Sequence, residues 1–112
     1  MGLQQTNDTN FEQLLSENEK VIVKYYAGWC GNCRLIAPKF KKLAEDERFS
    51  DITFLDVDAE NSPLARKTAG VDNLPFFATF IRGEKQEGMA TSVITSVEEM
   101  IVKLQGAAHE NS

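Results

Sequence analysis

Hydrophobic and polar residues follow two different periods along this chain, and each period predicts a different kind of element. Apolar residues spaced three and four positions apart predict amphipathic helices over about 9–17, 31–48, 62–70 and 97–105. Runs rich in β-branched and aromatic residues predict strands over 20–27, over 51–59, and on both sides of Arg82-Gly83-Glu84, which is a hairpin signal. Residues 3–6 have little β-branched character and leave a further edge strand open.

The order of these elements predicts the fold class. The order combines a parallel βαβ crossover with an antiparallel hairpin at the carboxyl end: helix, strand, helix, strand, helix, strand, strand, helix. We therefore expect an α/β fold with a mixed central sheet of four or five strands, flanked by helices on both faces. The nearly continuous apolar run 20–27 fits a central strand that is covered on both sides.

Local signals at the ends of the predicted helices refine this picture. Three hydroxyl-bearing residues precede helices and are expected to cap them: Thr9, Ser62 and Ser96. Pro38 interrupts the second helix and predicts a kink there. The tail after residue 105 carries no pattern and is expected to fray, so one domain over 1–112 should have its core at about 9–105.

Length, composition and charge restrict the class of protein. The chain has 112 residues, 42% hydrophobic and 26% charged, which suits one compact core. A net charge of −5 without a long basic run argues against nucleic acid or an anionic membrane as the main partner. The amino terminus lacks the basic start and apolar core of a signal peptide, and no apolar run approaches the ~20 residues of a membrane span. We expect a cytoplasmic monomer.

Cys30 and Cys33, the only cysteines, lie where the central strand gives way to a helix. The amino end of a helix stabilises an anion, so a thiolate at Cys30 is favoured and its pKa should lie below that of an ordinary cysteine. Cys33 lies one turn further on, close enough to close a disulfide with the first thiol. This spacing lets one sulfur attack a disulfide and the other resolve the product.

Two other interpretations of the cysteine pair compete with a redox role. A zinc site needs about four ligands, and the chain offers only two thiols and His109 in the tail. A second copy of the chain could supply the remaining ligands if the metal were shared across a dimer. Two buried cysteines could also lie together by chance. A CxxC sequence near a βαβ pattern in an intracellular protein nevertheless favours a dithiol redox site.

The stretch YYAGWCGNCRLIAPKF resembles the active-site region of the thioredoxin family, and the similarity extends from about Phe11 to Leu104. The acidic strand 53–58, the sequence GVDNLP ending in Pro75, and the hairpin Gly83 agree in order and spacing. The resemblance implies a thioredoxin fold and reduction of protein disulfides through a mixed disulfide. It implies no bound cofactor beyond a redox-active Cys30-Cys33 disulfide.

The resemblance also implies roles for individual residues. Cys30 matches the attacking cysteine, Cys33 the resolving cysteine, and Trp29 the tryptophan that packs beside them. Pro75 matches a cis-proline that faces the disulfide, and the backbone of Leu74 would pair with a substrate peptide.

The chain departs from the family pattern at the substrate-facing surface. The usual Gly-Pro between the cysteines is Gly31-Asn32, so the helix start lacks the fixed φ of proline. Within the family such changes tend to make the couple more oxidising. In the family a glycine usually lets a partner protein approach closely at the position where this chain has Thr91. The partners of this chain can therefore differ from those of the family. The docking surface would comprise Trp29, Gly31, Asn32, Leu74, Pro75 and Thr91.

A second departure concerns two charged residues. The family usually has a buried aspartate six residues before the first cysteine, where this chain has Lys24, and Asp56 stands where many bacterial members have a lysine. A buried charge needs a partner, which predicts contact between Lys24 and Asp56. Asp56 would then accept the proton of Cys33, directly or through water, and Lys24 would stabilise thiolate. The alternative is that Lys24 extends to solvent and Asp56 is hydrated.

The leading hypothesis is a protein-disulfide reductase that acts on disulfide-containing proteins and is recycled by a thioredoxin-reductase-like enzyme. One alternative is a more oxidising disulfide oxidase or isomerase. Another is a binding module that keeps the fold and carries incidental thiols.

Overall fold

The computed structural model describes residues 2–107 and contains one five-stranded mixed sheet. Its strands lie in the order β1-β3-β2-β4-β5. β1 and β2 run parallel to β3, whereas β4 is antiparallel to β2 and β5 is antiparallel to β4. The bounds are β1 (Leu3–Thr6), β2 (Lys20–Tyr26), β3 (Thr53–Asp58), β4 (Phe76–Ile81) and β5 (Glu84–Ala90). The open question at residues 3–6 is thereby settled, because this segment forms an edge strand.

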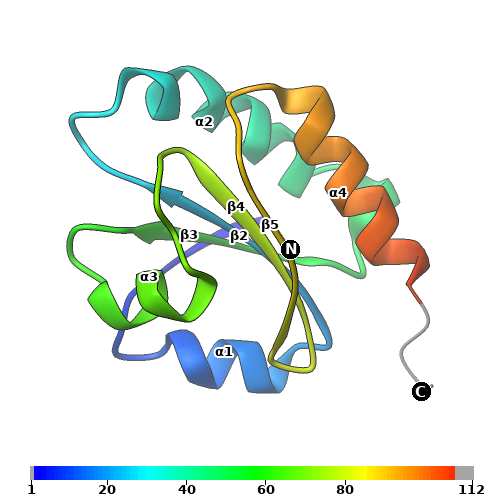
Figure 1. The fold of residues 1–112 in the computed structure, drawn as a ribbon. Helices are drawn as coiled ribbons and strands as arrows, with labels where there is room; N and C mark the ends of the chain where they lie inside the picture. The colour runs from blue at the N-terminus through cyan, green and yellow to red at the C-terminus, as the bar shows by residue number, and fades with distance from the viewer. Residues whose placement is uncertain (1, 108–112) are drawn as a thin grey trace.

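Within this described part of the chain, four α-helices cover the sheet on both faces, as the element order predicts. They are α1 (Phe11–Glu17), α2 (Gly31–Ala44), α3 (Pro63–Ala69) and α4 (Ile94–Gly106). α2 and α4 lie over one face of the sheet, and α1 and α3 lie over the other (Figure 1). The α/β class, the βαβ crossover and the hairpin are confirmed.

Strand β2 is buried on both faces, which explains its nearly continuous apolar sequence. Val21, Val23 and Tyr25 pack into the core beneath α1 and α3, and Ile22 packs into the core beneath α2 and α4. Side chains alternate between the faces of a strand, so Lys24 lies on the same face as Ile22. A lysine at this position is enclosed and needs a countercharge.

The expected cap positions were wrong at α1 and α4 and correct at α3. α1 begins at Phe11 after Asn10, so Thr9 lies outside it, and Ser96 lies inside α4, which begins at Ile94. Ser62 does precede α3, but its side chain makes no capping bond there.

Asp8 takes the capping role at α3 instead. Its two carboxylate oxygens accept hydrogen bonds from Leu64 N at 3.0 Å and Ala65 N at 2.8 Å. A negative charge at this end of a helix is also favoured by the helix dipole. The cap therefore comes from a residue far away in the sequence.

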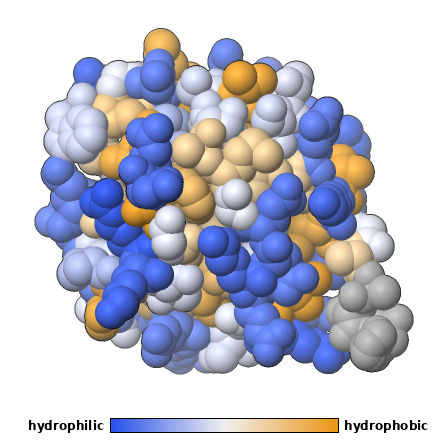
Figure 2. Space-filling model, viewed as in Figure 1, coloured by the Kyte–Doolittle hydropathy of each residue, from blue (hydrophilic) through white to orange (hydrophobic). Residues whose placement is uncertain are grey.

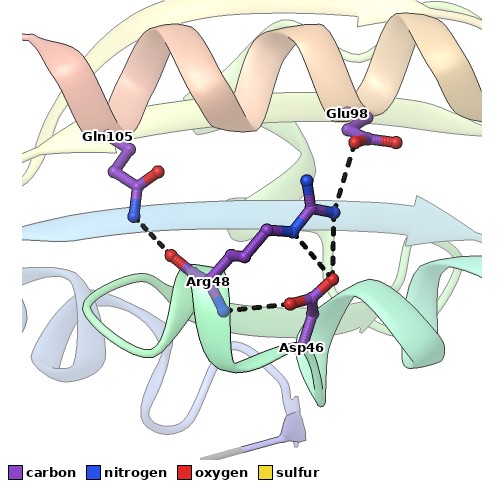
Figure 3. Close-up of polar contacts among 4 residues, drawn as sticks. All are labelled: Asp46, Arg48, Glu98 and Gln105. Atoms are coloured by element: carbon purple, nitrogen blue, oxygen red, sulfur yellow. Dashed lines mark hydrogen bonds and ion pairs between the residues drawn. The ribbon is translucent and has the colours of Figure 1, made fainter.

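The second helix is shorter than its sequence pattern predicts. α2 contains Pro38 and ends at Ala44, and a separate 3-10 turn spans Glu47–Phe49. The Asp46 carboxylate caps this turn by accepting from Arg48 N at 2.9 Å, and Arg48 Nη2 lies 2.9 Å from Asp46 Oδ2 and 3.3 Å from Glu98 Oε2 (Figure 3). Hydrogen bonds from Arg48 hold the pKa of Asp46 below its ordinary value. These contacts connect the end of α2 to α4.

Candidate active site

Cys30 and Cys33 form a disulfide at the amino end of α2, with their Cα atoms 5.2 Å apart. β2 ends at Tyr26, and a short turn closed by a hydrogen bond from Cys30 N to Ala27 O leads into the helix. Cys30 is the capping residue of α2, and its sulfur accepts a hydrogen bond from Cys33 N at 3.2 Å. A backbone donor and the helix dipole thus converge on this sulfur, which favours the thiolate once the disulfide is reduced.

Trp29, immediately before the disulfide, presents a large apolar side chain to solvent, with 67% of its surface exposed. Its indole nitrogen donates a hydrogen bond to the Glu60 carboxylate, beyond the end of β3. Arg34 Nη1 donates to Gly28 O at 2.7 Å and fixes the loop on the other side. The exposed indole therefore has a defined position next to the cysteines.

The peptide bond between Leu74 and Pro75 is cis, as the resemblance implied. Leu74 packs against the cluster that contains both cysteines. Thr91 N donates to Pro75 O at 3.1 Å and brings the end of β5 beside the proline. Asn32 and these three residues line a hollow of about 180 Å³. The structure thus brings the sequence-predicted surface residues together, with Gly31 exposed at the first position of α2.

Lys24 and Asp56 form a buried ion pair, and the alternative of two hydrated side chains was wrong. Lys24 Nζ lies 3.2 Å from Asp56 Oδ1, and the two side chains are only 3% and 8% exposed. The two residues are direct register partners on β2 and β3, which explains why they meet. Although this distance makes an ion pair, Oδ1 accepts no geometrically satisfactory hydrogen bond from the described part of the chain.

Gln5 on β1 completes this group, and the sequence reasoning missed it. Its Nε2 donates to Asp56 Oδ2 at 2.7 Å, and its Oε1 accepts from the Tyr26 hydroxyl at 3.4 Å. Burial, followed by the negative charges of Asp56 and Asp58, raises the pKa of Tyr26, so this hydroxyl remains a donor. No sequence signal marks Gln5, because the register of β1 against β3 decides which residue faces Asp56.

Tyr26 lies between the ion pair and the cysteines. It packs against the cluster of Ala27, Cys30 and Cys33, and Lys24 Nζ lies 5.3 Å from the centre of its ring. A single side chain therefore contacts both the redox pair and the charged group beneath it.

Metal-binding clusters and membrane-spanning helices are absent from residues 2–107. No three His, Cys, Asp or Glu side chains gather there in a way that could hold a metal ion. His109, the third ligand considered for zinc, lies outside the described residues. None of the described helices combines the length and apolar character needed to cross a membrane.

A disulfide at a strand-to-helix junction, opposite a cis-proline on a mixed sheet, defines the class of thiol-disulfide oxidoreductases built on the thioredoxin fold. The family model described as Thioredoxin matches residues 2–104. The chain belongs to the thioredoxin family.

Individual relatives agree with this assignment. Thioredoxin-1 of Schizosaccharomyces pombe is 34% identical over 87 residues, covering 78% of this chain and 82% of that protein. The mitochondrial Thioredoxin-3 of Saccharomyces cerevisiae is 34% identical over 70% of this chain and 58% of that protein. The crystal structure of Schistosoma mansoni thioredoxin superimposes with a TM-score of 0.82 at 33% identity, covering 91% of this chain and 94% of that one. The chain is accordingly a thiol-disulfide oxidoreductase of the protein-disulfide reductase type.

Proposed function

We propose that Cys30 and Cys33 carry out this reduction as attacking and resolving thiols. The observation that carries the proposal is the position of Cys30, whose sulfur caps α2 and accepts an amide hydrogen bond. In the reduced protein the Cys30 thiolate attacks a substrate disulfide, forms a mixed disulfide and releases one substrate thiolate. The Cys33 thiolate then attacks Cys30 Sγ, releases the second substrate thiolate and restores the Cys30-Cys33 disulfide.

Asp56 serves as the acceptor of the Cys33 proton, directly or through water. Its support is a buried carboxylate whose Oδ1 accepts no satisfactory hydrogen bond within the described residues. Lys24 holds the charge of this carboxylate in the interior and stabilises thiolate once the proton has moved. Neither side chain needs a bound cofactor to do so.

The substrate docks across the hollow between the start of α2 and the cis-proline loop. Asn32, Leu74, Pro75 and Thr91 line this hollow, and the exposed indole of Trp29 lies beside the same cysteines. Gly31 leaves room for a substrate strand to approach the sulfur of Cys30, and the backbone of Leu74 pairs with that strand. Large exposed apolar side chains beside polar groups are typical of protein-docking surfaces.

The expected setting is reducing. We infer that the protein works in the cytoplasm as a monomer, on proteins that contain disulfides. A thioredoxin-reductase-like enzyme returns two electrons to the Cys30-Cys33 disulfide after each cycle. A dithiol can reduce substrate disulfides repeatedly only in a compartment where a reductant regenerates the two thiols.

Reduction of insulin disulfides with dithiothreitol tests the proposal. We expect the wild-type chain to accelerate the reaction and Cys30→Ser to lose the acceleration. Equal rates for the two proteins would favour the binding-module alternative. Asn32 favours a second candidate, a more oxidising couple, and equilibration with glutathione distinguishes the two by the measured reduction potential.

A further inference from the structure

Gln5, on edge strand β1, lies in one row across the sheet with Asp56 and Lys24. The row lies on the face that also carries Ile22 and Phe54, which pack in the core beneath α2. α2 begins at the cysteine pair, so the row and the pair belong to the same side of the molecule. Gln5 is the exposed member of the row, and Asp56 and Lys24 are buried.

We propose that Gln5 is a positioning residue that holds one oxygen of Asp56 and leaves the other to receive the proton of Cys33. This inference rests on the proposed role of Asp56 as proton acceptor. The geometry that motivates it is a closed group of four side chains, in which Tyr26 bonds Gln5, Gln5 bonds Asp56, Asp56 pairs with Lys24, and Lys24 lies over the ring of Tyr26.

The hydrogen-bonding partners fix the orientation of the Gln5 amide. A carboxylate only accepts, so the amide nitrogen must face Asp56 Oδ2 at 2.7 Å. The amide oxygen then faces the Tyr26 hydroxyl, which donates to it. The two ends of the amide are thus assigned different partners, and the carboxylate cannot rotate without losing this bond.

This arrangement makes the two oxygens of Asp56 different. Oδ2 is occupied by the Gln5 amide, whereas Oδ1 faces Lys24 and accepts no satisfactory hydrogen bond within residues 2–107. A proton arriving at Asp56 therefore binds Oδ1. In that step the S–H bond of Cys33 breaks and an O–H bond forms on Oδ1, so the carboxylate becomes a carboxylic acid and the thiol a thiolate. The thiolate then attacks Cys30 Sγ of the mixed disulfide, and the substrate thiolate leaves.

A donor bonded to a carboxylate stabilises its negative charge. The charged and titratable groups linked to Asp56 are Lys24, which lies 3.2 Å from Oδ1, and Tyr26, which donates to Gln5 and also feels the charge of Asp58. Removal of the amide leaves all of these in place. Its loss should therefore move the pH dependence of the resolving step upward without removing the acceptor.

Gln5→Met tests this inference, with Gln4→Met as the matched control. Gln4 is the preceding residue of β1 and is also exposed, but its side chain lies on the opposite face of the sheet. The reduced protein is mixed in a stopped-flow instrument with substoichiometric Ellman's reagent. The first thionitrobenzoate released reports attack by Cys30, and the second reports resolution by Cys33.

We expect Gln5→Met to slow the second phase about tenfold at pH 7, near the lower end of what a hydrogen bond to a charged group contributes. The pH profile of this phase should move to higher pH. The first phase should stay within about twofold, which also shows that the variant is folded, and Gln4→Met should leave both phases unchanged. Combined with Asp56→Asn, Gln5→Met should cause no further slowing.

Each contrary outcome has a definite meaning. If Asp56→Asn slows the second phase and Gln5→Met does not, the role of Gln5 is overturned and that of Asp56 stands. If Asp56→Asn leaves the second phase unchanged, the proposed acceptor is wrong, and the role of Gln5 falls with it. Equal slowing by Gln5→Met in the wild-type and Asp56→Asn backgrounds would show that Gln5 does not act through Asp56.

Discussion

Asn32 occupies the second position of α2, between the two cysteines. A capping side chain accepts hydrogen bonds from the backbone N–H groups at the second and third positions of a helix. The third, from Cys33, already bonds the sulfur of Cys30. Asn32 keeps its own N–H, which proline at this position would lack, so a thiolate at Cys30 has a second donor within reach.

Replacing Asn32 with proline should make the couple more reducing. Loss of the donor destabilises the thiolate and hence the reduced protein, and we expect the potential to become more negative by about 30 mV, which corresponds to ~1.4 kcal/mol. Equilibration with glutathione measures the shift. Asn32→Ala is the control because it keeps the N–H and should change the potential much less. Equal shifts in the two variants would contradict this explanation.

At the scale of elements, the ion pair between β2 and β3 places two charges inside the sheet-helix interface. Breaking such a pair leaves one charge buried without a partner, whereas replacing both members with apolar residues is often neutral. Substitution of one or both members therefore distinguishes a role of the charges in stability from a role in the chemistry of the enzyme.

Lys24→Met should lower the free energy of unfolding by about 3 kcal/mol, because Asp56 loses its countercharge. The double variant Lys24→Met with Asp56→Leu should recover most of this loss and still resolve mixed disulfides slowly. Urea unfolding measures the first effect and the release of the second substrate thiol measures the second. A double variant as unstable as the single one would show that the strands require the pair.

The network of Asp46, Arg48 and Glu98 gives a pH-dependent contact between the end of α2 and α4 (Figure 3). Hydrogen bonds from Arg48 lower the pKa of Asp46 in the folded protein. Its contribution to stability is therefore present above the ordinary pKa of an aspartate, about 4, and is lost as the pH falls through the lower folded value.

The difference in unfolding free energy between wild type and Asp46→Asn should therefore be present at pH 6 and disappear towards pH 2. Urea titrations over this range measure it. Asp72→Asn, at an exposed aspartate outside the network, serves as the control and should show less pH dependence. A difference between wild type and Asp46→Asn that is constant over the range would contradict the assignment.

At the scale of the whole molecule, the redox state of one short loop is linked to the stability of the entire fold. The disulfide closes a loop from residue 30 to residue 33. The face of the molecule seen in Figure 2 is a mixture of hydrophilic residues and a more hydrophobic area near its centre. A crosslink lowers the conformational entropy of the unfolded chain. In the chain-entropy model this raises the unfolding free energy by about 2 kcal/mol for a loop of this length.

The oxidised protein should thus unfold at higher urea than the reduced protein, with a difference of about 2 kcal/mol in unfolding free energy. Urea titrations with and without a reductant measure this difference. The double variant Cys30→Ser with Cys33→Ser should show no dependence on the reductant. A reduced protein more stable than the oxidised one would contradict the prediction and indicate a strongly oxidising couple.

Local sequence was sufficient to predict the parts of the site that depend on neighbouring residues. The cysteine spacing and the strand-to-helix junction placed Cys30 at the start of α2, and the resemblance placed a cis-proline at Pro75. The contact of Lys24 with Asp56 followed from the resemblance, which put the two residues at paired positions, together with the need of a buried charge for a partner.

Partners from distant parts of the chain are set by how the elements pack in three dimensions. Asp8 caps α3 in place of Ser62, and Gln5 holds Asp56, although each lies more than fifty residues from its partner. The element types, the redox pair and the need for charge balance follow from the amino-acid sequence, because these depend on periodicity and local chemistry. Strand register and loop closure determined which side chains supply the caps and hydrogen bonds, since a shift by one residue would have placed Gln4 rather than Gln5 beside Asp56.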